Sequence, residues 1–96
     1  MFDKMKGLME MKKQADCIKR ELDASIVEIN EVKGVKVVVN GSQNFRSLEI
    51  DETLLGAQNK TKLENDILRS VNKAIERSQR LAAEKMKAVM PGLPGM

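Results

Sequence analysis

The sequence predicts an α/β fold of the α+β type: an N-terminal helix, a three-stranded antiparallel sheet, a short helical turn and a long C-terminal helix. Apolar residues recur every three or four positions before residue 23 and after residue 58, as in amphipathic helices. Between these segments they alternate with polar residues, as in strands, and Asn40-Gly41 interrupts the alternation with a turn signal. The length of 96 residues suits one domain, expected over residues 1–90, followed by a flexible Pro/Gly tail at 91–96.

The first helix is expected from about Asp3 to Leu22. Its apolar residues recur at intervals of three and four and form one narrow seam: Leu8, Met11, Ala15, Ile18 and Leu22. Such a narrow seam favours a second helix beside it rather than a broad core.

Three strands are expected in the middle of the chain. A turn within residues 30–34 separates the first strand from the second, and the Asn40-Gly41 turn separates the second from the third. Alternation places one set of residues on the core face: Val27, Ile29, Val35, Val37, Val39, Leu48 and Ile50. It leaves three apolar residues for the opposite face: Ile26, Val38 and Phe45.

The last helix is expected to begin near Asn59 or Thr61, where Thr61 and Glu64 fit a capping box. Before it, Asp51 can cap a short helical turn that ends at Gly56. The helix should run about 30 residues, or roughly 45 Å. A three-stranded sheet cannot cover that length, so we expect its far end to protrude and the chain to dimerise. The predicted interface combines the first-helix seam with the second sheet face: Leu8, Met11, Ala15, Ile18, Val38 and Phe45.

The composition argues against catalysis. The chain has no histidine and one cysteine, Cys17, which excludes histidine-based triads, intrachain disulfides and zinc-finger ligand sets. We therefore expect no catalytic residue, no metal and no cofactor. Phe2 and Phe45 are the only aromatic residues, so single-strand binding by base stacking is poorly supported. No apolar run reaches the ~20 residues of a membrane span, and a cytoplasmic location is expected.

Positive charge is concentrated in the helices. Residues 1–21 hold six bases and four acids, and residues 57–96 hold eight bases and four acids. The segment between them holds three bases and six acids, so the sheet is acidic. This asymmetry favours an anionic partner for the helices.

With these features placed, the chain resembles the YbaB/EbfC family of bacterial nucleoid-associated DNA-binding proteins over nearly its whole length. The resemblance rests mainly on Val35-Lys-Val-Val-Val-Asn-Gly41, followed by Leu48-Glu-Ile-Asp51 and Leu54-Leu55. The opening Met1-Phe2 and a Met- and Lys-rich first helix add to it. The resemblance implies a homodimer with projecting helices that binds duplex DNA without catalysis, with low or variable sequence specificity, in the cytoplasm at the nucleoid.

The predicted DNA contacts lie on both helices. On the last helix, bases gather near one line: Lys62, Arg69, Lys73, Arg77, Arg80 and Lys87. On the first helix, the bases nearest the free end are Lys4, Lys6, Lys12 and Lys13. Lys and Arg neutralise phosphates and release condensed counterions.

Three other interpretations remain open from the sequence. The line on the last helix can also be a solvated face, because Asp66 and Glu84 lie close to it and Glu76–Arg80 is a favourable i, i+4 pair. The alternative function is a protein-interaction module for the replication or recombination machinery. A prefoldin-like chaperone arm fits less well, because the first helix is short.

Overall fold

The computed structural model describes the backbone of residues 2–89 and the side chains of residues 6–88. Along the chain, one helix precedes and one follows a three-stranded sheet, as the sequence predicts: α1 (Phe2–Ala24), β1 (Ile26–Val32), β2 (Val35–Asn40), β3 (Phe45–Ile50) and α2 (Lys60–Val89). The expected Pro/Gly tail lies outside the described residues. The predicted fold class and element order are therefore confirmed.

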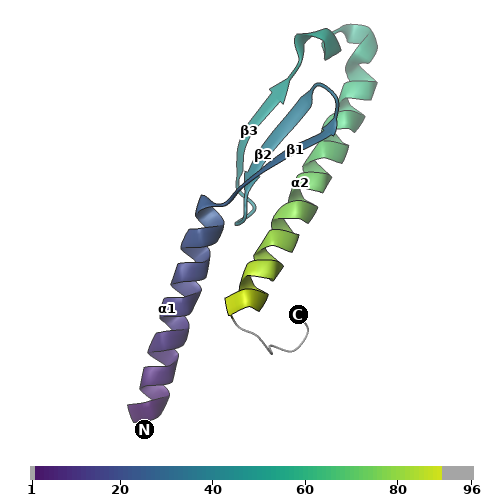
Figure 1. The fold of residues 1–96 in the computed structure, drawn as a ribbon. Helices are drawn as coiled ribbons and strands as arrows, with labels where there is room; N and C mark the ends of the chain where they lie inside the picture. Colours follow the sequence, from purple (N-terminus) through teal and green to yellow (C-terminus); the bar gives the residue numbers. More distant parts are fainter. Residues whose placement is uncertain (1, 90–96) are drawn as a thin grey trace.

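The sheet is antiparallel with β2 in the centre, and α2 lies across one of its faces (Figure 1). The core consists of the alternating apolar residues of β1 and β2 and one alanine of α2: Ile29, Val35, Val37, Val39 and Ala74. Ala74 is fully buried, as are Ser70 and Ser78 one turn to either side. Small residues at these positions let the helix backbone lie close to the sheet.

The loops follow the turn chemistry of the sequence. Lys33-Gly34 closes the first hairpin, with Gly34 at φ 90°. A Cβ on Gly34 would meet Leu54 Cδ1 at 2.7 Å, but that side chain can move aside, so the positive φ is the main reason for glycine here. Asp51 caps a 3-10 helix, Glu52–Leu54, by accepting from the Thr53 amide at 2.9 Å. The Thr53 hydroxyl donates to the same carboxylate oxygen at 2.9 Å. The two bonds, that from the amide first, lower the pKa of the Asp51 carboxyl.

The start of α2 differs from the expected capping box. A 3-10 helix at Ala57–Asn59 runs directly into α2 at Lys60, so Thr61 lies inside the first turn instead of capping it. The helix length of 30 residues agrees with the prediction. The local cap motif was misleading because the preceding 3-10 turn already supplies the helix start.

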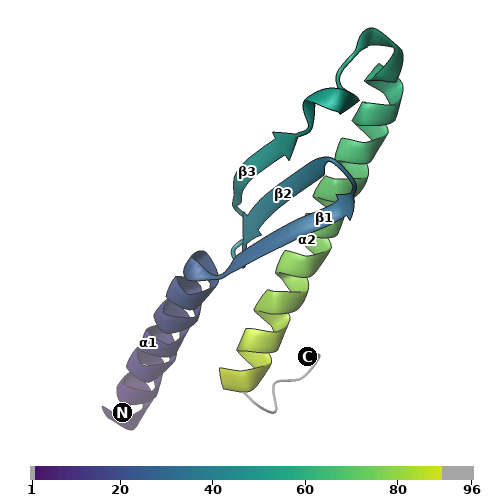
Figure 2. The ribbon, with the colours of Figure 1, turned by 45° about the horizontal axis from the view of Figure 1, so that its top comes forward.

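The molecule is elongated, with extents of 67 × 23 × 16 Å. Its radius of gyration is 18.5 Å, against about 12–13 Å for a compact domain of this length. The helices run antiparallel, and α1 lies beside the C-terminal end of α2 (Figure 1, Figure 2). Glu21 and Lys85 bridge them at 3.8 Å. The far end of α2 is thus partly covered, and the N-terminal part of α1 projects instead.

Phe45 lies on a different sheet face from the one that alternation predicts. The β2–β3 register shifts between Val38 and Val39, so that Phe45 pairs with Val39 and shares the face that α2 covers. The opposite face is charged rather than apolar, because Lys36 bridges Glu28 at 3.1 Å and Glu49 at 3.8 Å. These pairs raise the pKa of Lys36 and lower that of Glu28.

Candidate nucleic-acid interface

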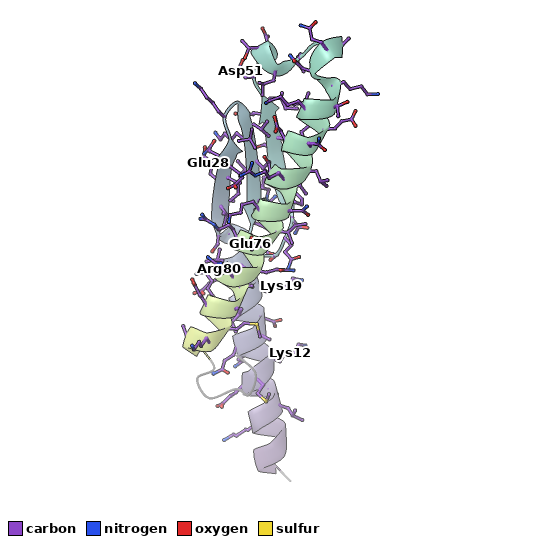
Figure 3. The ribbon with its side chains drawn as sticks, turned by 90° about the vertical axis from the view of Figure 1, so that its right-hand side faces the viewer. Lys12, Lys19, Glu28, Asp51, Glu76 and Arg80 are labelled. Atoms are coloured by element: carbon purple, nitrogen blue, oxygen red, sulfur yellow. The ribbon has the colours of Figure 1, made fainter. Side chains whose placement is uncertain are left out.

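Four cations of α1 form a surface that we call the α1 basic face: Lys12, Lys13, Lys19 and Arg20. The spacing 12–19 and 13–20 is two helical turns, so each pair lies along one line of the helix, about 10 Å apart. All four are exposed, and in Figure 3 Lys12 and Lys19 extend from the same side of α1. Among the side chains that the structure describes, none of the four forms an ion pair.

The geometry of α1 keeps this face open. The apolar side of the helix, with Ile18 buried, turns toward α2. Lys19 borders this side, where it lines a groove with Ile18 and Met86 of α2, and its side chain remains exposed. Asp16 is the one acid between the four cations in sequence, and it is exposed. Over residues 12–20, four cations and one carboxylate leave a net charge of +3 on this part of α1.

The predicted line of bases on α2, which we call the α2 basic line, comprises Lys62, Arg69, Lys73, Arg77, Arg80 and Lys87. Most of these residues have acidic partners. Lys62 pairs with Asp66 at 3.0 Å, and Arg69 pairs with Glu31 of β1 at 3.3 Å. Glu76 holds two further cations of the line, Lys73 at 3.7 Å and Arg80 at 3.3 Å. Figure 3 shows Glu76 and Arg80 beside each other on α2. The Glu76–Arg80 pair expected from the sequence is therefore present.

The remaining predicted contacts fall into two groups. Arg77 and Lys87 are exposed and form no ion pair with a described side chain. Lys6 is exposed on α1, and the side chain of Lys4 lies outside the described residues. The structure thus has two separate basic surfaces, and the α1 basic face has fewer ion pairs with acidic side chains than the α2 basic line.

On α1, the site prediction left out two bases, Lys19 and Arg20. It favoured the free end of the helix, whereas the open face extends back toward the sheet. The seven-residue spacing from Lys12 and Lys13 is the signal that could have found them.

An exposed apolar surface lies on the other flank of α2, which we call the β3–α2 strip: Phe45, Leu48, Leu68, Val71 and Ile75. Phe45, Leu48 and Leu68 are 46%, 49% and 61% exposed. Phe45, Leu48 and Val71 line an open groove of about 370 Å³ whose floor includes Val37. An apolar surface of this kind on a small protein marks a contact site.

The predicted interface residues are distributed differently. Leu8 and Met11 are exposed, as expected for an unpartnered seam. Ile18 is 6% exposed and is buried within the single chain, so it is not available to a second copy. Val38 is half-buried on the charged face of the sheet.

The described part of the chain has neither a metal-ligand cluster nor a membrane-spanning helix. No group of three or more metal-ligating side chains gathers among residues 6–88. Neither helix carries, within the described residues, an apolar stretch that could cross a membrane.

The sequence matches the model of the YbaB/EbfC DNA-binding family over residues 1–93. The chain belongs to this family. Two curated YbaB/EbfC relatives are described as nucleoid-associated proteins. One, from Dictyoglomus thermophilum, is 28% identical over 97% of this chain and 90% of its own length. The other, from Methylocella silvestris, is 32% identical and is covered to 96% on both sides.

The YbaB/EbfC fold is also found in a solved structure. The crystal structure of an uncharacterized protein from Helicobacter pylori superposes with a TM-score of 0.76, covering 88% of this chain and 90% of that one. The two sequences are 21% identical, so the likeness establishes the fold alone.

Proposed function

We propose that this chain is a non-catalytic, nucleoid-associated protein of the bacterial cytoplasm that binds duplex DNA as a homodimer with low sequence specificity. The observation that carries the proposal is the α1 basic face, where four exposed cations share no described acidic partner. Phosphate is the ligand that such a surface binds best, because each neutralised phosphate releases a condensed counterion. The family match and the names of the relatives agree with this choice of ligand.

The type of contact argues for low specificity. Lys and Arg on a convex helix contact the phosphate backbone, which positions a protein but carries no sequence information. The α2 basic line adds a second, weaker surface, because four of its cations already have acidic partners. These pairs are at least partly exposed, and a surface pair contributes only about 0–1 kcal/mol. A cation in such a pair can exchange its acidic partner for a phosphate. The gain in binding free energy is then smaller than for a cation that has no partner to give up.

The β3–α2 strip supports the homodimer. It joins exposed apolar residues of the edge strand β3 to those of α2, and β3 carries unpaired backbone groups along its outer edge. A second copy that packs there would cover both and leave the basic surfaces of the two chains free. This assigns the interface to Phe45, Leu48 and Leu68, in place of the charged sheet face around Val38.

The first experiment measures duplex binding against salt. Mobility shifts with several unrelated duplexes should give similar affinities, and the affinity should fall on the order of a thousandfold or more between 50 and 200 mM salt. Light scattering on the same sample gives the oligomeric state. An affinity that stays flat across this range would refute the electrostatic mechanism, and a strong preference for one duplex would refute low specificity.

The second experiment tests the interface. Phe45→Asp should raise the dimer dissociation constant by about a hundredfold, because it places a charge in an apolar contact. Ile26→Asp is the matched control, since Ile26 is 59% exposed on the other sheet face. Equal weakening by both variants would count against the strip. A monomeric wild type that retains a foreign protein on the strip would instead favour the interaction-module function.

A further inference from the structure

The turn between β2 and β3 makes an unusual set of contacts with the end of α1. Asn40 is completely buried, and its side-chain amide donates to the Asp23 carbonyl of α1 at 3.3 Å. The Gly41 amide donates to two further carbonyls at the same helix end, Leu22 at 2.9 Å and Ser25 at 3.0 Å. The Ser42 hydroxyl donates to the Asp23 carboxylate.

These bonds satisfy carbonyls that a helix C-terminus leaves without a partner. The last four carbonyls of a helix have no intrahelical donor and need another source. At this helix end, two carbonyls of α1 receive donors from Asn40 and Gly41, which lie 17 and 19 positions further along the chain than their partners Asp23 and Leu22. The next residue, Ser25, caps the helix locally, donating its hydroxyl to the Glu21 carbonyl at 2.6 Å and its amide to the Leu22 carbonyl at 3.2 Å. The sheet adds a second set of caps from a distant part of the chain.

Asn40 also holds the turn and α2 in place. Its side-chain oxygen accepts from the amides of Ser42 at 3.0 Å and Asn44 at 2.9 Å, which fixes the shape of the turn. Its backbone carbonyl accepts from the buried Ser78 hydroxyl of α2 at 2.7 Å. One residue thus connects three elements: α1 through its amide nitrogen, the turn through its amide oxygen, and α2 through its carbonyl.

Gly41 lets α1 approach this closely. A Cβ at position 41 would lie 2.9 Å from the Leu22 side chain, and 3.0 and 3.1 Å from the Leu22 carbonyl oxygen and Cα. Backbone atoms cannot move aside as a flexible side chain can. Any side chain at position 41 must therefore push the end of α1 away from the sheet.

We infer that residues 40–42 form a joint that fixes the direction of α1, and that Asn40 is a positioning residue for DNA binding. The helix is about 34 Å long and is held at one end, so a tilt of 10° moves the other end by roughly 6 Å. The other links to α2, the buried Ile18 and the partly exposed Glu21–Lys85 pair at 3.8 Å, also lie in the last two turns of α1, so they leave its N-terminal part without support. For its role in binding, the inference rests on the proposed function.

The test measures the direction of α1 itself. Spin labels at Glu10→Cys on α1 and Gln79→Cys on α2, in a Cys17→Ser background, report the distance between the helices. Labelled protein is equilibrated with excess unlabelled Cys17→Ser protein, so that each measured pair lies within one chain. In the parent protein we expect a narrow distance distribution.

Asn40→Asp is the diagnostic variant, because it keeps the acceptor for Ser42 and Asn44 and replaces the donor to the Asp23 carbonyl with an oxygen. It also brings a negative charge to this buried position, which further disfavours the contact with α1. If it frees α1 by 20°, the distribution widens by roughly 7 Å, and duplex affinity falls about tenfold because the arm must be ordered on binding. Ser78→Ala is the matched control, since it cuts the bond to α2 and leaves the α1 contacts intact. It should lower the unfolding temperature and keep the distribution narrow.

Each outcome decides the inference. A distribution as narrow in Asn40→Asp as in the parent, or one equally widened by Ser78→Ala, would overturn the joint. If Asn40→Asp does not fold, as judged by circular dichroism, Ser42→Ala takes its place, and an unchanged distribution there would overturn the joint as well. A widened distribution with unchanged affinity would refute the role in DNA binding alone. If the parent protein does not bind duplex DNA, the proposed function is refuted. The spin-label distances test the joint independently of that result.

Discussion

The two helices carry similar numbers of positive charges and use them differently. On α1, four neighbouring cations face solvent with no acidic partner among the described side chains. On α2, Lys62, Arg69, Lys73 and Arg80 share three acids at distances of 3.0–3.7 Å. Counting basic residues would rate the two helices alike, whereas counting unpaired ones favours α1. The position of each acid therefore decides which helix offers phosphates a free donor.

The largest expected effect comes from neutralising the α1 basic face. Replacing Lys12, Lys13, Lys19 and Arg20 with Gln should weaken duplex binding by about a hundredfold or more at 100 mM salt. The salt dependence should flatten at the same time, since each lost phosphate contact removes about 0.9 from the slope. Mobility shifts over a salt series measure both. An affinity within threefold of the parent's would remove α1 from the site.

A matched change on α2 should have a smaller effect. Replacing Lys62, Arg69, Lys73 and Arg80 with Gln removes the same four charges, so any difference between the two variants reflects position and not net charge. We expect less than about a tenfold loss, because these cations already have acidic partners. If this variant lost as much affinity as the α1 variant, the compensation would be irrelevant and both helices would contribute equally.

The opposite change should strengthen binding. Asp66→Asn combined with Glu76→Gln removes the partners of Lys62, Lys73 and Arg80 and should raise duplex affinity by about threefold to tenfold. The control removes two acids that lie away from the α2 basic line, Glu52→Gln with Glu64→Gln. Equal gains in both double variants would show that net charge alone governs affinity.

The smallest effect is expected on the sheet, between the two helices. The pKa of Glu28 lies below its ordinary value of 4.5, mainly through its hydrogen bond and ion pair with Lys36. The pair therefore stabilises the fold above pH 4.5, and this contribution is lost as the pH falls through the lowered pKa. The pKa of Lys36 is raised above its ordinary value of 10.5. The pair therefore keeps its full contribution up to about pH 10.5 and loses it as the pH rises through the raised pKa.

Lys36→Met should accordingly cause a slight loss of stability at pH 7 that shrinks toward pH 3, as measured by urea unfolding. Duplex affinity at pH 7 should change by less than about twofold, because the charged sheet face is not part of the site. Lys33→Met is the control, since Lys33 lies in the exposed first turn. A large loss of DNA affinity in Lys36→Met would place the sheet in the binding surface and break the contrast between the helices.

The local patterns of the sequence determined much of the fold. Alternation identified the buried valines of β2, helical spacing identified both helices, and Asp51 and Asn40-Gly41 marked the turns correctly. These signals work because each depends on residues within a few positions of one another. The pair Glu76–Arg80 was predictable for the same reason. The absence of histidine from the sequence also bounded the chemistry.

Only the tertiary structure decided the features that depend on how distant segments meet. The bulge opposite Val38 and Val39 turned Phe45 to the other sheet face, and no alternation pattern shows where a register shifts. Arg69 forms an ion pair with Glu31, which lies 38 positions away in the sequence. Asn40 was predicted as a turn residue, yet its partners lie at the end of α1 and on α2. The placement of α1 beside α2 decided which cations remained free, because pairing across space follows packing and not spacing along the chain.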